Sequence, residues 1–156
     1  MEKRDSVLHV VVGVDASPSS HAALRWAVQY AELIGGDVVA VAAWEPPWAY
    51  GWSAPAVDPT FDRTIAERGF VNQVRQVLGE SDAAQVRKRL VKGHPVEVLL
   101  SEAKGAAALV VGSRGMGGFR RTLLGSVSQQ CALHATCPVV IVRATVEVPD
   151  SGTYAE

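Results

Sequence analysis

The residues best suited to chemistry lie between Gly112 and Ser126. The sequence there reads Gly-Ser-Arg-Gly, then nine residues, then Gly-Ser. Glycines at positions 112, 115 and 125 predict turns with positive φ, which would bring backbone N–H groups close to a bound anion, and Ser126 adds a hydroxyl group. The segment therefore predicts a binding site for phosphate groups.

The number of glycines alone leaves two interpretations open, a phosphate cradle and a flexible loop. Neither Gly-x-Gly-x-x-Gly nor a glycine run followed by Lys-Ser or Lys-Thr occurs, so the Rossmann and Walker patterns do not apply. Phosphate charge would be met by backbone dipoles at the amino end of the next helix, by a divalent ion, or by Arg114, Arg120 or Arg121. These arginines are equally compatible with solvated surface positions.

Other reactive side chains give little support for fast catalysis. No serine, cysteine or carboxylate pairs with His134 by motif, and the sequence has neither paired carboxylates nor a metal-ligand cluster. Cys131 and Cys137 lack metal-ligand spacing and are expected to be reduced thiols. A binding protein is therefore favoured over an enzyme, and no catalytic residue is assigned.

Length and composition predict one domain over residues 1–156, with an ordered core at about 7–144 and a polar tail at 145–156. Of the 156 residues, 48% are hydrophobic, and 15 basic against 16 acidic residues give a net charge of −1. No overall field would attract nucleic acid or an anionic membrane. Without a signal peptide or a membrane span in the sequence, we expect a cytoplasmic protein.

Strands and helices alternate along the sequence. This pattern predicts a three-layer open α/β sandwich with a mostly parallel five-stranded sheet and four helices. Ligands of such sheets bind beyond the carboxyl ends of the strands, where Asp15 and Gly112 are both expected. We expect strands at 10–15, 37–44, 85–91, 107–111 and 138–142, and helices at 18–34, 59–78, 95–103 and 126–134.

A basic cluster, Arg87-Lys88-Arg89, lies in the third expected strand. Charges that alternate with Val86 and Leu90 are typical of a strand at the edge of a sheet, where they block pairing with another chain. A nucleic-acid patch is the alternative interpretation of this cluster.

The glycine pattern carries a family resemblance. Gly112-x-x-Gly115, nine residues, Gly125-Ser126-Val127-Ser128 and then His-Ala-Thr-Cys-Pro-Val-Val-Ile-Val at 134–142 resemble the universal stress proteins. The opening is similar too, with Val-Gly-Val-Asp-Ala-Ser at 12–17 before an alanine-rich helix. The likeness extends from about residue 8 to about residue 143.

Within that family, the spacing with Gly-Ser resembles the ATP-binding branch. The resemblance implies a strand order of 3-2-1-4-5, a ribose near Gly112, and an adenine near Ala43. Asp15 would meet the nucleoside, and phosphates would be held by backbone N–H groups and the hydroxyls of Ser126 and Ser128. The implied binding residues are Gly13, Val14, Asp15, Ala43, Val111, Gly112, Arg114, Gly115, Gly125, Ser126, Val127 and Ser128. For Asp15 and Ser126, helix capping is the alternative role.

The resemblance thus implies a nucleotide-dependent regulatory protein of the stress response that binds ATP, or else AMP or ADP, with or without Mg²⁺ or Mn²⁺. Two alternatives stay open: a slow ATPase or self-phosphorylating protein, and a nucleotide-independent interaction module. A homodimer through the strand at 139–142 is also implied. The Trp- and Pro-rich segment 45–59 is unassigned, because its aromatic residues Trp48, Tyr50 and Trp52 suit either base stacking or partner contacts.

Overall fold

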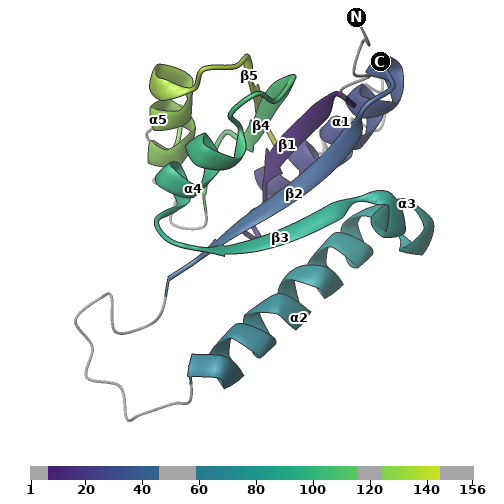
Figure 1. Cartoon of the computed structure of the whole chain (residues 1–156), viewed down its shortest axis with the longest axis vertical. Helices are drawn as coiled ribbons and strands as arrows, with labels where there is room; N and C mark the ends of the chain where they lie inside the picture. Colours follow the sequence, from purple (N-terminus) through teal and green to yellow (C-terminus); the bar gives the residue numbers. More distant parts are fainter. Residues whose placement is uncertain (1–6, 46–58, 116–123, 145–156) are drawn as a thin grey trace, which may run out of the picture.

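The computed structural model describes residues 7–45, 59–115 and 124–144, and their path is drawn in Figure 1. Strands and helices alternate in it as the sequence predicts. The strands are β1 (His9–Gly13), β2 (Asp37–Trp44), β3 (Arg87–Lys92), β4 (Ala108–Gly112) and β5 (Val139–Val142). The helices are α1 (Pro18–Ile34), α2 (Pro59–Leu78), α3 (Glu80–Gln85), α4 (Pro95–Glu102) and α5 (Ser126–His134).

All five strands form one parallel sheet in the order β3-β2-β1-β4-β5. The predicted order and the predicted edge position of the charged strand are both confirmed. Strand order reverses between β1 and β4, which pair through Val10 with Ala108 and Val12 with Val110. The carboxyl ends of these two strands therefore mark the place where a ligand of this fold is expected.

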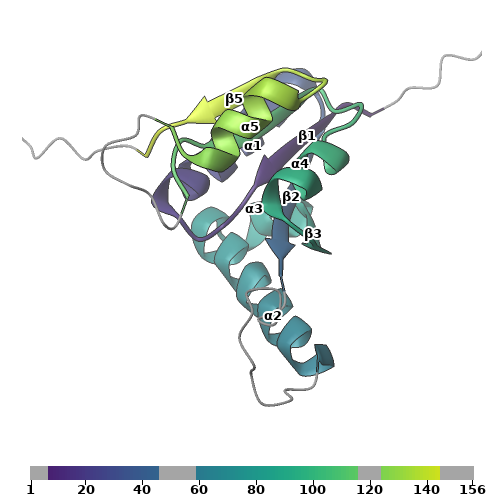
Figure 2. The ribbon, with the colours of Figure 1, turned by 90° about the vertical axis from the view of Figure 1, so that its left-hand side faces the viewer.

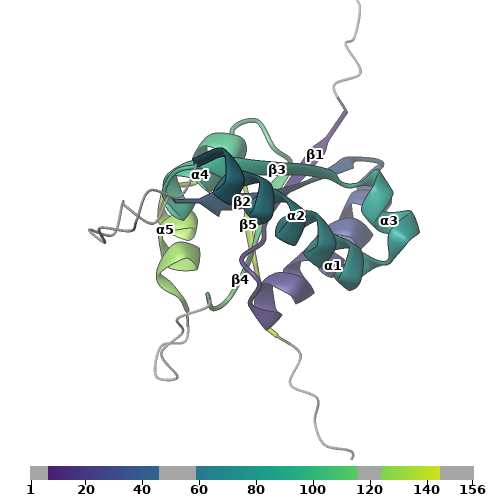
Figure 3. The ribbon, with the colours of Figure 1, turned by 90° about the horizontal axis from the view of Figure 1, so that it is seen from below.

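Helices cover both faces of the sheet, as Figures 1 and 3 show. On one face α1, α2 and α3 bury alternate residues of the central strands, such as Val10, Val12 and Ala40. On the other face α4 and α5 cover Val11 and its neighbours. Along the sheet, α5 lies toward β5 and α2 toward β3 (Figure 2). The result is the predicted three-layer sandwich.

Local signals set the bounds of α1. Ser17 is its N-cap and accepts the N–H of Ser20 at 3.2 Å, while Pro18 occupies the first helical position. At the other end Gly35 adopts a left-handed conformation (φ 66°) and donates to the Ala31 carbonyl. The amino end of α1 is thus fixed directly after β1.

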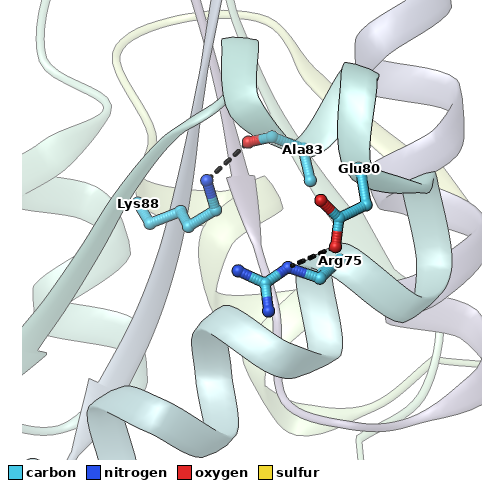
Figure 4. Close-up of polar contacts among 4 residues, drawn as sticks. All are labelled: Arg75, Glu80, Ala83 and Lys88. Carbon is cyan, nitrogen blue, oxygen red and sulfur yellow. Dashed lines mark hydrogen bonds and ion pairs between the residues drawn. The ribbon is translucent and has the colours of Figure 1, made fainter.

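The structure adds one helix to the four that were predicted. Gly79, with φ 81°, ends α2, and the short α3 follows at once, so β3 begins at Arg87 rather than at 85. An ion pair between Arg75 and Glu80 (3.4 Å) joins the two helices, and Lys88 donates to the Ala83 carbonyl at 2.5 Å (Figure 4). A glycine at positive φ stops one helix without preventing the next one.

Candidate functional site

A cavity of about 270 Å³ opens at the carboxyl ends of β1, β2 and β4. The first residues of α4 and α5, Pro95 and Ser126, line it as well. The amino end of a helix presents N–H groups without partners inside the helix. The cavity therefore lies at the predicted switch point and is near the lower end of the size range of small-molecule sites, about 300–1,000 Å³.

All twelve residues predicted to bind a nucleotide line this one cavity: Gly13, Val14, Asp15, Ala43, Val111, Gly112, Arg114, Gly115, Gly125, Ser126, Val127 and Ser128. The structure brings them together from β1, β2, β4 and the amino end of α5. Five further lining residues were missed by the sequence analysis: Ser17, Ser20, Val41, Pro95 and Leu99. Val41 could have been inferred, because it lies two positions before Ala43 on the same strand.

The predicted positive φ of the three motif glycines is wrong. Positive φ among the described glycines occurs at 35, 79, 93 and 105, and Gly125 has φ −69°. Close approach is what requires Gly112: a Cβ there would lie 2.5 Å from Ser19 Oγ and 2.7 Å from the backbone nitrogen of Ser20. The strand end thus packs directly on the first turn of α1, with no room for a side chain.

Gly115 and Gly125 are less tightly enclosed. A Cβ on Gly115 would lie 3.2 Å from Asp15 Oδ2, and one on Gly125 would lie 3.3 Å from the backbone nitrogen of Gly115. The two glycines therefore allow the backbone after β4, the backbone before α5 and the Asp15 carboxylate to approach one another closely.

A left-handed residue does occur between two lining residues of the cavity, but it is an alanine. Ala16 has φ 70° and lies between Asp15 and the α1 N-cap. This conformation costs an L-residue roughly 1–2 kcal/mol relative to a right-handed one. Such backbone strain is concentrated at functional sites.

Asp15 is not the N-cap of α1 but is hydrogen-bonded to the N-cap residue, Ser17. Its Oδ1 accepts the Ser17 N–H at 3.0 Å and the Ser17 hydroxyl at 2.5 Å, and Ser17 itself caps α1. The capping role considered for Asp15 is thus taken by Ser17. Oδ2 lies on the side of Gly115, so one oxygen of the carboxylate is held while the other faces the motif glycines.

The two predicted serines have different environments. Gly125, not Ser126, is the N-cap of α5, and Ser126 is exposed and forms no side-chain hydrogen bond with any described residue. Ser128 is buried, and its hydroxyl donates to the carbonyls of Gly125 (2.9 Å) and Ser113 (3.4 Å). Ser126 is therefore the hydroxyl available to a ligand, and Ser128 holds the loop in place.

Ser19 fastens the backbone after β4 to α1, which sequence reasoning did not find. Its hydroxyl donates to the Arg114 carbonyl at 2.7 Å and accepts the Arg114 N–H at 3.2 Å. Gly125 N–H donates to the Ser113 carbonyl at 2.7 Å. These bonds occupy the backbone N–H and C=O groups of Arg114. The first N–H groups of α5 have no partner inside the helix, and the first three residues of α5 line the cavity.

The charged side chains of the cavity lining are Asp15 and Arg114, and both are exposed. Across the described ranges 7–45, 59–115 and 124–144, no group of three or more His, Cys, Asp or Glu residues could hold a metal ion. In the same ranges, no helix is long and apolar enough to cross a bilayer. The described part of the site thus offers backbone dipoles, one serine hydroxyl without a partner, one cation and one carboxylate, and is suited to binding a polar anion.

Several predicted features lie outside the described residues. These are the aromatic residues Trp48, Tyr50 and Trp52, the arginines Arg120 and Arg121, and the polar tail at 145–156.

Comparison with known sequences identifies relatives over almost the whole described chain. The sequence model of the universal stress protein family matches residues 7–143. A universal stress protein of Mycolicibacterium smegmatis is 37% identical over 142 residues, which cover 89% of this chain and 47% of that protein. Universal stress protein Rv2623 of Mycobacterium tuberculosis is 33% identical, with coverages of 92% and 50%. The chain therefore spans about half the length of the curated relatives it matches.

Solved structures share the fold. Universal stress protein UspA from Lactobacillus plantarum has a TM-score of 0.66 at 22% identity, covering 87% of this chain and 97% of that one. A universal stress protein solved in complex with cAMP has a TM-score of 0.66 at 25% identity, covering 90% and 100%. An Archaeoglobus fulgidus homologue solved with dAMP has a TM-score of 0.61 at 23% identity, covering 86% and 97%.

Proposed function

This chain belongs to the universal stress protein family, and we propose that it is a regulatory protein of the stress response that binds an adenine nucleotide. The nucleotide that we propose is ATP, and its site is the cavity between β1, β4 and α5. The observation that carries the proposal is the convergence of all twelve predicted residues on one cavity beside a helix amino terminus. A relative of 25% identity binds cAMP, which supports an adenine nucleotide as the ligand class.

In this proposal the phosphates lie against the first turn of α5. The N–H groups of Ser126 and Val127, the Ser126 hydroxyl and the positive end of the helix dipole attract them. Arg114 adds a charge at the rim, and Mg²⁺ or Mn²⁺ bound with the nucleotide would neutralise the rest. Without the lysine of a Walker motif, the site depends on backbone geometry, which explains the density of glycine.

The nucleoside then extends toward β1 and β2. Asp15 Oδ2, whose partner oxygen is held by Ser17, would accept a ribose hydroxyl beside the end of β4. Val41, Ala43 and Leu99 give an apolar wall for the base, with backbone groups near Ala43 to recognise its edge. AMP and ADP would fill the same subsites with fewer phosphate contacts.

The test is calorimetric titration with ATP, ADP, AMP and cAMP, together with mass analysis of any nucleotide that co-purifies. Gly115→Ala places a methyl group 3.2 Å from Asp15 Oδ2 and should weaken ATP binding about tenfold or more. Gly69→Ala is the matched control, because a Cβ at that position in α2 meets nothing within 4 Å. Protein that carries no nucleotide and gives no binding heat with any of the four would refute the proposal.

Regulatory binding is favoured over turnover by the side chains present. Among the described lining residues Asp15 is the sole carboxylate, one of its oxygens is already occupied, and no histidine lines the cavity. The second candidate function is slow hydrolysis of ATP, or transfer of its phosphate to the exposed Ser126. Phosphate release that is equal in the parent and in Gly115→Ala would exclude turnover at this site.

We also propose a homodimer formed through β5. This strand is at the edge of the sheet, and all four of its apolar residues are only half-buried in the single chain. An unpaired apolar edge is suited to pairing with a second copy. Equilibrium sedimentation should therefore give a dimer at micromolar concentration with or without ATP, and a monomer would contradict the dimer without touching the nucleotide proposal.

A further inference from the structure

A second cavity lies at the opposite end of the sheet, at the amino ends of the strands. It has a volume of about 160 Å³ and is lined by residues of β1, β2, β3, the end of α4 and the connection after it. The rise of about 3.3 Å per residue puts His9 and Gly13, at the two ends of β1, about 13 Å apart. The two cavities are therefore separate.

The length of α4 explains why this cavity exists. Eight helical residues span about 12 Å, whereas the six residues of β3 span about 20 Å. Pro95 at the start of α4 lines the first cavity, and Glu102 at its end lines the second. The helix thus leaves the amino ends of the strands uncovered on this face of the sheet.

The register of the sheet places an exposed arginine beside two buried valines at this cavity. Val11 pairs with Val39, and Val39 pairs with Arg87, so the three residues form one row on one face. Val11 and Val39 are buried, and Arg87 and Arg89 both line the cavity. Lys88 has the opposite orientation and donates to backbone carbonyls near α3 (Figure 4). The basic cluster is thus divided between the two faces.

The charges of the cavity do not cancel. Arg89 forms a two-pronged ion pair with Glu102, with Nε to Oε2 at 2.7 Å and Nη2 to Oε1 at 3.1 Å. Arg87 and Lys104 have no ion pair or side-chain hydrogen bond with any described residue. Two cations therefore remain unbalanced, in a chain whose net charge is −1.

His9 contributes a third polar side chain to this cavity. Nδ1 of His9 is inaccessible to solvent and has no hydrogen-bond partner, the one such side-chain atom in the described part of the chain. His9 lines the same cavity as Arg87 and Lys104. Because Nδ1 is closed to solvent, the ring nitrogen that a ligand in the cavity would contact is Nε2.

We propose that Arg87, Lys104 and His9 form a second anion site, which binds a phosphate group. Two unpaired cations match the charge of a phosphate dianion, and the imidazole supplies a further hydrogen bond to one of its oxygens. Arg89 is a positioning residue, because its ion pair with Glu102 fastens the end of α4 to β3. The volume of about 160 Å³ is sufficient for one phosphate group.

The experiment follows the imidazole signals of the full chain by NMR during titration with inorganic phosphate, with His9→Gln used to assign the His9 signal. We expect a saturable shift of the His9 signal. Arg87→Gln combined with Lys104→Gln should weaken binding about tenfold or more, since two charge-assisted contacts are lost. Arg63→Gln combined with Arg68→Gln, which removes two exposed cations from α2, should leave it unchanged.

Titration with methyl phosphate shows whether the bound phosphate is a free ion or part of a larger molecule. Tighter binding of inorganic phosphate identifies the free ion as the ligand, and equal or tighter binding of methyl phosphate identifies a phosphate group on a larger molecule. Either result supports the site. The proposal fails if the His9 signal does not move, or if it moves equally in the Arg87→Gln, Lys104→Gln protein. ATP binding in the first cavity is measured separately, so failure of one proposal leaves the other standing.

Discussion

At the scale of single residues, the site depends on how closely backbones approach rather than on unusual backbone angles. Gly112 is pressed against the backbone of Ser19 and Ser20, whereas Gly125 has ordinary φ and looser surroundings. Two glycines of one motif therefore have different tasks. The first allows β4 to lie on α1, and the second leaves the entrance to α5 free of side chains.

This difference predicts stability effects of different size for the same substitution at the two glycines. Gly112→Ala forces a methyl group to within 2.7 Å of backbone atoms, which cannot rotate away, and should lower the free energy of unfolding by about 3 kcal/mol. Gly125→Ala meets its first neighbour at 3.3 Å and should change it by less than about 1 kcal/mol. Urea unfolding of both variants measures this, and equal losses would refute the distinction.

A second residue-scale prediction concerns the left-handed alanine. Ala16→Gly removes the strain of φ 70° and should stabilise the protein by about 0.5–1 kcal/mol after the entropy cost of glycine is subtracted. Ala22→Gly in the interior of α1 is the matched comparison and should destabilise it by about 1 kcal/mol. If both variants have a lower Tm than the parent in thermal unfolding, Ala16 is unstrained.

At the scale of elements, α1 is linked to α2 by a histidine. His21 Nε2 lies 2.7 Å from Gln73 Nε2, across the two helices. Burial lowers the pKa of His21 below its usual 6.5, the charge of Arg25 lowers it further, and the charge of Asp15 opposes both effects. The folded protein therefore prefers the neutral imidazole more strongly than the unfolded chain does.

The sign of the pH dependence follows from that shift. Because the folded pKa lies below the unfolded one, the contribution of His21 is complete above about pH 6.5 and is lost as the pH falls toward the folded pKa. Urea unfolding between about pH 7.5 and 5.5 should show the parent losing stability relative to His21→Gln, whose side chain does not titrate. If the difference in free energy of unfolding between the two proteins stays constant over this pH range, His21 is not the source of the pH dependence.

Most elements could be predicted because their signals are local. Ser17-Pro18 starts α1, Gly35 ends it, and the apolar run at Val139–Val142 forms β5 as expected. The short α3 was missed because six mostly polar residues after a glycine carry no helical periodicity. The twelve site residues converge because parallel strands bring their carboxyl ends together.

The remaining part of the site could not be predicted, since it depends on contacts between distant segments. Ser19 and Arg114 are 95 positions apart, and no local pattern shows that this hydroxyl holds that backbone. The expectation of positive φ at the motif glycines was also wrong because the motif does not show which distant segments pack against it. The need for glycine at 112 arises from α1, which the motif itself does not contain.

At the scale of the whole molecule, the proposed nucleotide site joins segments that lie far apart in sequence. β1, the end of β2, the end of β4 and the start of α5 all contribute lining residues. Releasing any one of these segments dismantles the cavity. A ligand that requires all of them should therefore stabilise the fold as a unit rather than one region of it.

The last prediction follows from this linkage and rests on the proposed function. ATP at about 100 times its dissociation constant should raise the free energy of unfolding by about 2.7 kcal/mol. For a chain of this size that corresponds to an increase in Tm of roughly 5–10 °C. Gly69→Ala should keep the increase, and Gly115→Ala should lose most of it. If calorimetry detects ATP binding while the Tm of the parent stays constant, the ligand is held by a part of the chain that does not unfold with the sheet, and the four-segment site is wrong.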